Sequence, residues 1–134
     1  MEETVKRELS IVAKFSDTEI EKEVLSKPQK KSPIRHRLIY RSIYYFYIKM
    51  WLDLFPQKQC LILKSEDLFY NPENTMKKCF SFLGVSDYDV IDYFNANPGS
   101  YPGISSSFRD TLSNFFNPYN RQLEELIQIR LDWK

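Results

Sequence analysis

The sequence feature that most constrains the fold is a short apolar run, Cys-Leu-Ile-Leu at residues 60–63, which has the length of a single β-strand. The run shows no alternation of polar and apolar residues, which is typical of a central strand in a parallel sheet covered on both faces. The 134-residue chain contains no second convincing strand. A buried strand without neighbours leaves its backbone donors and acceptors unpaired, which is costly. We therefore expect either an incomplete domain or one that pairs with another copy or another protein.

The strongest helical pattern lies just before this run, over residues 40–55. Large apolar side chains recur there at the i, i+3, i+4 and i+7 spacing of a helix face. They are Tyr40, Ile43, Tyr44, Tyr47, Ile48, Trp51, Leu52 and Phe55. Phe46, Met50 and Leu54 form a second apolar line beside that face, so the helix is expected to pack on more than one side. Pro56 ends it, because the residue before a proline is steered away from helical angles.

Shorter helices are expected on both sides of this segment. Residues 2–13 and 17–25 have the pattern of polar, amphipathic helices, whereas residues 27–33, with two prolines and three lysines, are typical of a loop. A further helix is predicted to begin at Asn71-Pro72-Glu73, where the residue types suit an N-cap, a first helical position and a positive helix end. The residues expected to be buried on one side of this helix are Met76, Cys79, Phe80 and Leu83. Gly84 is expected to end the helix.

The last third of the chain is predicted to be a loop and two helices. Residues 95–107 are rich in Asn, Pro, Gly and Ser, and a loop of that length is a fair candidate for a functional role. Ser105 or Ser106 is expected to cap the first helix, and Asn117-Pro118 to cap a separate final helix. The expected inward residues are Phe108, Leu112, Phe115 and Phe116 in the first helix, and Tyr119, Leu123, Leu126 and Ile127 in the second.

Composition and charge exclude several classes of protein. A content of 43% hydrophobic and 16% aromatic residues argues against disorder, and a formal net charge of +1 gives no general attraction to nucleic acid or membranes. No secretory signal or transmembrane helix is expected, because the start is acidic and the most apolar segment, residues 38–55, carries Arg41, Lys49 and Asp53. Cys60 and Cys79 form no paired motif, so we favour reduced, buried thiols in a cytoplasmic protein over a disulfide.

Four motifs follow one another along the chain at the spacing of a known family. In order they are Tyr44-xx-Tyr47-Ile48-xx-Trp51-Leu52-xx-Phe55-Pro56; Ser65-Glu66-Asp67-Leu68-xx-Asn71-Pro72; Thr75-Met76 with Phe80-xx-Leu83-Gly84; and Asn97-Pro98-Gly99-Ser100-Tyr101-Pro102 with Arg109, Leu112, Phe116, Tyr119, Asn120 and Leu123. This order resembles the C-terminal half of the PAPS-dependent sulfotransferases of the bacterial and heparan-sulfate type, PAPS being 3′-phosphoadenosine 5′-phosphosulfate. The resemblance is strong after about Arg41 and weaker before it.

The resemblance implies an α/β fold. Residues 38–134 would form the mostly helical C-terminal part of a P-loop-like sulfotransferase domain with a single evident strand at about 59–64, and residues 1–37 a variable helical and basic segment. The implied activity is transfer of a sulfuryl group from PAPS to a hydroxyl or amine. In that family the phosphosulfate-binding loop lies upstream of the part present here, and this chain has no GxxxxGK[ST] loop. We expect the chain alone to be inactive, and no catalytic residue is assigned.

The resemblance points to one binding loop. Gly99, Ser100 and Tyr101 lie where the family's loop closes over the nucleotide end of the donor, and an ordinary surface turn is an equally good interpretation. Tyr47 matches a helix position that is a catalytic or acceptor-facing histidine in some relatives. A tyrosine on an apolar stripe is more often part of a core, so a core role is favoured.

Charged residues elsewhere are expected to have structural roles. Glu66 and Asp67 are interpreted as cap or turn residues rather than as an acid–base pair, and His36 as a solvated residue. No metal site is expected. An acid-free set of basic residues could attract an anionic or glycan-like acceptor or the donor's phosphates, although a solvated loop is favoured. Its members are Lys27, Lys30, Lys31, Arg35, Arg37 and Arg41.

Three hypotheses for function stay open. The first is the C-terminal portion of a sulfotransferase, either a truncated gene product or half of a split enzyme. PAPS would be its co-substrate, and its protein partner would be the missing N-terminal half or another copy of the chain. Neither nucleic acid nor a membrane is expected as a partner. The second is a non-catalytic helical interaction module derived from that fold. The third is a small helical protein that binds nucleic acid through its basic stretch, with steep salt dependence.

Overall fold

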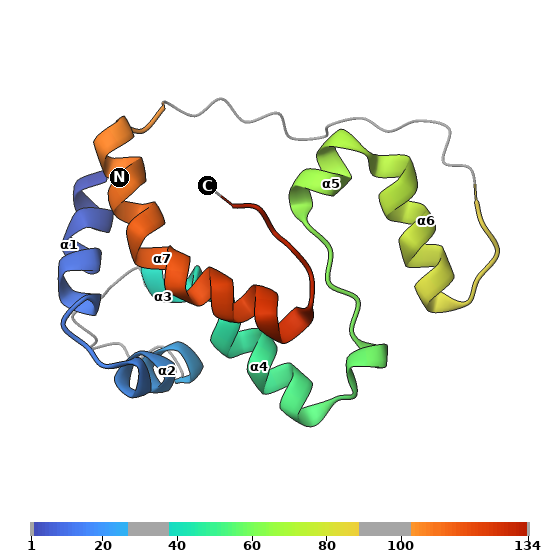
Figure 1. Cartoon of the computed structure of the whole chain (residues 1–134), viewed down its shortest axis with the longest axis horizontal. Coiled ribbons are helices and arrows are strands. Elements are labelled where there is room, and N and C mark those ends of the chain that lie inside the picture. The colour runs from blue at the N-terminus through green and yellow to red at the C-terminus, as the bar shows by residue number, and fades with distance from the viewer. Residues whose placement is uncertain (1, 27–37, 89–102, 134) are drawn as a thin grey trace. The chain divides into compact units, whose positions relative to one another are not determined.

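The structure is a computed structural model that describes residues 2–26, 38–88 and 103–133 (Figure 1). Every regular element in these ranges is helical. The elements are α1 (Glu2–Val12), α2 (Asp17–Leu25), α3 (Leu38–Arg41), α4 (Tyr44–Leu54), a short 3-10 turn (Gln57–Gln59), α5 (Ser65–Tyr70), α6 (Pro72–Leu83) and α7 (Ser106–Ile127). They divide into two compact units. Unit 1 combines Met1–Leu54 with Gly103–Lys134, and unit 2 is Phe55–Pro102.

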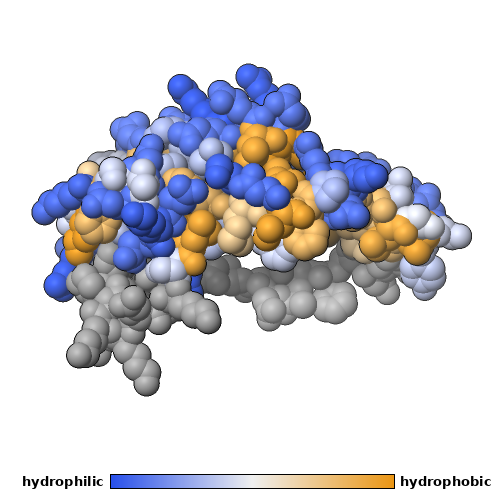
Figure 2. Space-filling view, turned by 90° about the horizontal axis from the view of Figure 1, so that it is seen from below, coloured by the Kyte–Doolittle hydropathy of each residue, from blue (hydrophilic) through white to orange (hydrophobic). Residues whose placement is uncertain are grey.

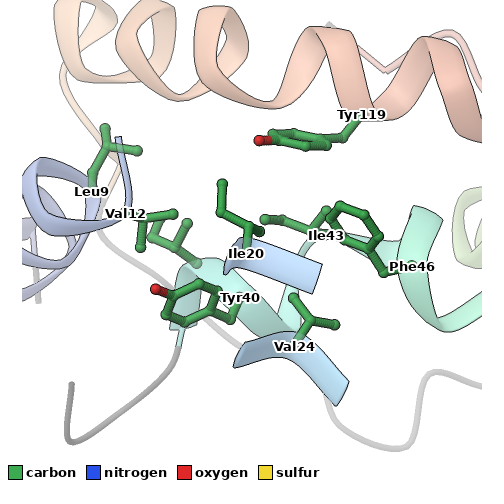
Figure 3. Close-up of a cluster of buried hydrophobic side chains, with 9 residues drawn as sticks. Leu9, Val12, Ile20, Val24, Tyr40, Ile43, Phe46 and Tyr119 are labelled. Atoms are coloured by element: carbon green, nitrogen blue, oxygen red, sulfur yellow. The ribbon is translucent and has the colours of Figure 1, made fainter. Parts of the chain in front are cut away.

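Unit 1 has an apolar core to which five helices contribute. Helix α3 packs on α1 and α2, and α4 packs on α2 and α7. The buried side chains are Leu9, Val12, Ile20, Val24, Ile39, Tyr40, Ile43, Phe46 and Tyr119. In Figure 3 the Tyr119 ring extends from α7 over Ile20 and Ile43, which closes the core on that side. Burial of each such side chain contributes about 1.5–3 kcal/mol, so this cluster is the main source of stability in unit 1.

The predicted bounds of α2 and α6 are confirmed, and local sequence signals explain both helices. The Ser16 hydroxyl accepts a hydrogen bond from the Glu19 N–H, and the Ser16 N–H donates to the Glu19 carboxylate at 2.8 Å. This capping box fixes the start of α2 and holds the pKa of Glu19 below its usual range. Pro72 occupies the first turn of α6, and Gly84 ends that helix in the left-handed conformation, with φ of 67°.

The predicted helix break at Asn117-Pro118 is wrong. Helix α7 runs without interruption from Ser106 to Ile127, with Ser105 at the N-cap position and Pro118 inside the helix. A proline in a helix interior costs about 3 kcal/mol because it removes one hydrogen bond and crowds the preceding turn. The same apolar stripe continues past the proline to Tyr119, Leu123 and Ile127, all buried. The burial of that stripe outweighs the local cost of Pro118.

The single helix expected over residues 40–55 is divided in two. Helix α3 ends at Arg41, and α4 starts at Tyr44. Between them the N–H groups of Ser42 and Ile43 donate to the carbonyls of Ile39 and Tyr40, three residues back rather than four. This tighter turn changes the direction of the chain between α3 and α4. As a result, the side chains of Ile39, Tyr40, Ile43 and Phe46 are all buried in the core.

The strand expected at about 59–64 is not formed in the described residues, which contain no β-strand, so the α/β prediction is not met there. The backbone is nevertheless extended at Cys60, with φ of −117° and ψ of 115°. A strand is defined by its hydrogen-bonded neighbours, and none of the described segments pairs with this one. The described fold is therefore mostly helical.

Candidate functional site

A buried carboxylate connects α1 to the start of α3. The Glu8 side chain is only 4% exposed, and its two oxygens accept hydrogen bonds from the N–H groups of Leu38 and Ile39 at 2.9 and 3.0 Å. Free N–H groups at a helix start favour negative charge, which offsets the cost of burying the carboxylate. Glu8 is therefore a helix cap supplied from a distant segment. No local sequence pattern predicts this cap, although Glu8 adjoins the apolar stripe of α1.

Two tyrosine hydroxyls connect the helices of unit 1. The Tyr119 hydroxyl donates to Asp17 at the start of α2 at 3.1 Å, and the Tyr47 hydroxyl donates to the Val24 carbonyl, also at 3.1 Å. Burial, with Asp17 as a second cause, raises the pKa of Tyr119 to about 12. The Tyr47 ring packs against the core cluster. In this structure the Tyr47 hydroxyl thus positions α4 on α2, which favours the core role.

The raised pKa of Tyr119, caused first by burial and then by Asp17, gives a pH prediction for unit 1. The folded-state pKa of about 12 lies above the unfolded value near 10, so the folded state favours the neutral phenol. The stabilising contribution is complete below about pH 10 and is lost as the pH rises through about 12. In urea titrations across this range, the unfolding free energy of the Tyr119→Phe variant should fall less than that of the unaltered chain. Parallel curves for the two proteins would contradict the assignment.

Glu66 and Asp67 lie together in the first turn of α5, where negative charge is favourable. The Asp67 carbonyl accepts the N–H of Asn71 at 2.8 Å, and this bond ends α5 immediately before α6 begins. No side-chain cap hydrogen bond is present at the start of α5, so the cap or turn interpretation of Glu66 and Asp67 stays a prediction. Sequence reasoning missed α5 itself, because its six residues are too few to show an apolar period.

The main predicted binding residues lie outside the described part of the chain. These are Gly99, Ser100 and Tyr101. His36, interpreted as a solvated residue, and the basic residues from Lys27 to Arg37 also lie outside the described part. Arg41, at the end of α3, is described and is exposed. Among the described residues there is no group of His, Cys, Asp and Glu that could hold a metal ion. Cys60 and Cys79 are both free thiols.

The described residues alone do not fit the phosphates of PAPS. A phosphate cradle needs several backbone N–H groups that converge, usually at a glycine-rich turn before a helix. Of the two glycines in the described ranges, Gly84 is the stop of α6 and Gly103 precedes α7 by three residues. The whole sequence has only one other glycine, Gly99. Neither glycine of the described ranges therefore forms such a phosphate cradle.

The sulfotransferase domain family matches residues 14–96. This region extends from the end of α1 beyond the end of α6 and includes the first three of the four motifs. It covers more than half of the chain, and the chain therefore belongs to the sulfotransferase domain family.

Curated relatives are sulfotransferases of low sequence identity. The membrane-associated sulfotransferase kil1 of Dictyostelium discoideum is 24% identical over 97 residues, which are 72% of this chain and 21% of that protein. The bifunctional heparan sulfate N-deacetylase/N-sulfotransferase 1 of Xenopus laevis is 24% identical, with 87% of this chain and 16% of the relative covered. Heparan sulfate glucosamine 3-O-sulfotransferase 5 of Homo sapiens is also 24% identical, and the match covers 74% of this chain and 35% of that protein.

The chain thus spans between 16% and 35% of the length of these three relatives. No solved structure matches the chain. Within residues 2–26, 38–88 and 103–133, no helix is both long enough and apolar enough to cross a membrane.

Proposed function

We propose that this chain is the C-terminal portion of a sulfotransferase that transfers a sulfuryl group from PAPS to a hydroxyl or amine acceptor. The observation that carries the proposal is the family match over residues 14–96. The order of motifs from Tyr44 to Leu123 adds support, because it continues past the end of that match. The α/β, P-loop-like architecture of a complete domain belongs to this proposal as well.

The portion is proposed to be inactive alone. Transfer of a sulfuryl group leaves negative charge on the departing phosphate, and that charge must be stabilised by converging N–H groups, a helix N-terminus or a cation. This sequence has no glycine-rich phosphate loop. The missing N-terminal half would supply these groups, either in the same polypeptide or as a separate one.

An anionic, glycan-like acceptor is proposed. Two of the relatives are named for heparan sulfate, and kil1 is named as a membrane-associated sulfotransferase, without an acceptor. The basic residues between Lys27 and Arg41 would favour an anionic chain by local electrostatics. The loop with Gly99, Ser100 and Tyr101 is proposed to contact the nucleotide end of the donor through its backbone, a hydroxyl and a ring. A cytoplasmic location stays a prediction.

The test is isothermal titration with PAP, the desulfated product of the donor. One sample is the purified chain. The other is a fusion in which this chain replaces the matched segment of the human 3-O-sulfotransferase 5, so that the relative supplies the upstream part. We expect heat of binding from the fusion and none from the chain alone. A folded fusion that binds no PAP would contradict the proposal.

The Ser100→Ala variant of the fusion tests the proposed loop. A hydrogen bond to a charged phosphate is worth about 1.5–3 kcal/mol, so loss of the Ser100 hydroxyl should weaken PAP affinity about tenfold or more. The matched control is Ser81→Ala, at an exposed position of α6, which should leave the affinity unchanged. Equal affinities of the two variants would remove Ser100 from the site and favour an ordinary surface turn.

One observation favours the alternative of a non-catalytic interaction module. Many large apolar side chains of the described residues are exposed, among them Phe69, Tyr70 and Leu83 in unit 2. Figure 2 shows such apolar side chains (orange) at the surface on the face drawn there. An exposed apolar surface marks a contact with another polypeptide whether or not catalysis follows. Sulfuryl transfer by the fusion separates the two functions, because a pure interaction module does not support transfer.

A further inference from the structure

The last described segment, residues 128–133, follows α7 within unit 1 and turns back after the helix (Figure 1). The N–H groups of Leu131 and Asp132 both donate to one carboxylate oxygen of Glu124, on α7, at 2.6 and 3.2 Å. The bond from Leu131 is the main reason why the pKa of Glu124 lies below its usual range. A charged acceptor forms stronger hydrogen bonds than a neutral one, so this single carboxylate fixes the middle of the segment.

Two further features hold the segment in place. The Trp133 ring lies 5.8 Å from the ring of Tyr44, measured between the ring centroids, and Tyr44 is the first residue of α4. Tilted aromatic pairs at this distance attract one another. The Leu131 side chain, between Glu124 and this ring pair along the segment, is only 3% exposed. Residues 128–133 therefore lie against the first turn of α4.

The backbone is strained near both ends of the segment. Gln128 has a φ of 57° and Asp132 a φ of 53°, and no other non-glycine residue of the described ranges has a positive φ. Glycine is the residue that usually adopts this left-handed conformation at a helix end, because a Cβ makes it unfavourable. Such angles persist only where the surroundings hold them. Residues at the end of an element that can relax to ordinary angles are suited to act as hinges.

We propose that residues 128–133 are a strap, closed in this structure over the start of α4, that opens while the core of unit 1 stays packed, and that Glu124 is its latch. The strap contains no helix or strand, so one side chain holds its backbone rather than a ladder of hydrogen bonds. Segments of this kind open at a lower free energy than a packed core.

Opening of the strap frees the face of Tyr44 that Trp133 contacts. Tyr44 begins the first of the motifs that the chain shares with its family, and the strap therefore controls access to the start of that helix. The strap does not depend on the proposed function, because Glu124, Tyr44 and the strap itself all belong to unit 1.

The test is the rate of thiol labelling in the full chain, with both native cysteines replaced by serine. Leu131→Cys places a thiol on the closed strap, and Val12→Cys, in a separate chain, places one in the core of unit 1, where the native side chain is 0% exposed. A buried thiol reacts only when its surroundings open, so its labelling rate reports that opening. We expect Leu131→Cys to react about tenfold faster than Val12→Cys or better, because local opening costs less than unfolding.

Three substitutions separate the latch from the core. Glu124→Ala removes the acceptor of two N–H groups and should raise the Leu131→Cys rate about tenfold. The matched control Glu125→Ala, at the exposed neighbouring position of α7, should leave that rate unchanged. Ile43→Ala should raise the Val12→Cys rate about a hundredfold and leave the Leu131→Cys rate unchanged, because an open strap keeps the core packed.

Two results would overturn the proposal. Equal rates for Leu131→Cys and Val12→Cys, raised together by Ile43→Ala, would identify a fixed segment that opens only when unit 1 unfolds. Equal effects of Glu124→Ala and Glu125→Ala on the Leu131→Cys rate would show that Glu124 is no latch.

Amide hydrogen exchange, followed by nuclear magnetic resonance, repeats the comparison with the Leu131 side chain intact. The N–H of Leu131 should exchange faster than that of Leu123 in the middle of α7, and Ile43→Ala should accelerate only the exchange of Leu123. Acceleration of both by Ile43→Ala would contradict the strap without any cysteine variant.

Discussion

Replacement of Ile43 by alanine should destabilise unit 1 by about 3 kcal/mol, within the range for large-to-small changes at buried aliphatic positions. Ile43 has no exposed surface and lies between α3 and α4, in contact with the cluster that Tyr119 closes (Figure 3). The cavity would form where α2, α4 and α7 meet, so no single helix can move to fill it. Urea denaturation followed by far-ultraviolet circular dichroism measures the loss.

Two variants control for the Ile43 result. Ile43→Val removes one methylene and should cost about 0.5–1.5 kcal/mol. Leu54→Ala removes a side chain that is 70% exposed at the end of α4, and the unfolding free energy should change by less than about 0.5 kcal/mol. Equal effects of Ile43→Ala and Leu54→Ala would mean that the core described for unit 1 is not the core of the protein.

Replacement of Glu8 by alanine should cost about 2–4 kcal/mol of unfolding free energy. The change removes the acceptor from the buried N–H of Ile39 and from the partly buried N–H of Leu38, and a buried, unsatisfied donor costs about 1–3 kcal/mol. Glu8→Gln should cost less, because one amide oxygen still accepts a hydrogen bond from this helix start.

The matched control for Glu8 is Glu3→Ala on the same helix. The Glu3 side chain is 89% exposed and forms only a surface ion pair with Lys6 at 3.4 Å. Exposed pairs of this kind contribute little, so the control should be nearly neutral. If Glu8→Ala were as mild as Glu3→Ala, the cap across α1 and α3 would not be a stabilising contact.

Local chemistry made part of this fold predictable. The start of α2 follows from Ser16 and Glu19, and the two ends of α6 follow from Pro72 and Gly84, because each signal acts within one helical turn. The amphipathic pattern of α1 was predicted on the same basis. In these elements the tertiary structure and the local preference agree.

The remaining features depend on residues far apart in the sequence. Pro118 predicts a break by itself, but the buried stripe on both sides of it keeps α7 continuous. Glu8 caps a helix some thirty residues away, a contact that no local pattern contains. The run at 60–63 has the composition of a strand, yet strand formation needs a partner that the described residues do not supply. Non-local pairing is thus the part of the fold that sequence reasoning could not settle.

For the candidate site, the sequence correctly predicted the protein family, whereas the predicted site residues stay untested. The match over residues 14–96 confirms the resemblance that the motifs indicated. The specific residues Gly99, Ser100 and Tyr101 lie outside the described ranges, so their role stays a prediction. For Tyr47, by contrast, the hydrogen bond from its hydroxyl to the Val24 carbonyl supports the favoured core role.

The most direct test of the central claim is transfer of radiolabelled sulfate from PAPS to a desulfated heparan sulfate acceptor. The fusion that supplies the upstream part should label the acceptor, and the chain alone should not, since it lacks a phosphate loop. Labelling by the chain alone would contradict the claim that this is an incomplete sulfotransferase domain. A folded, PAP-binding fusion that labels no hydroxyl or amine acceptor would contradict the claim that the chain contributes to sulfuryl transfer.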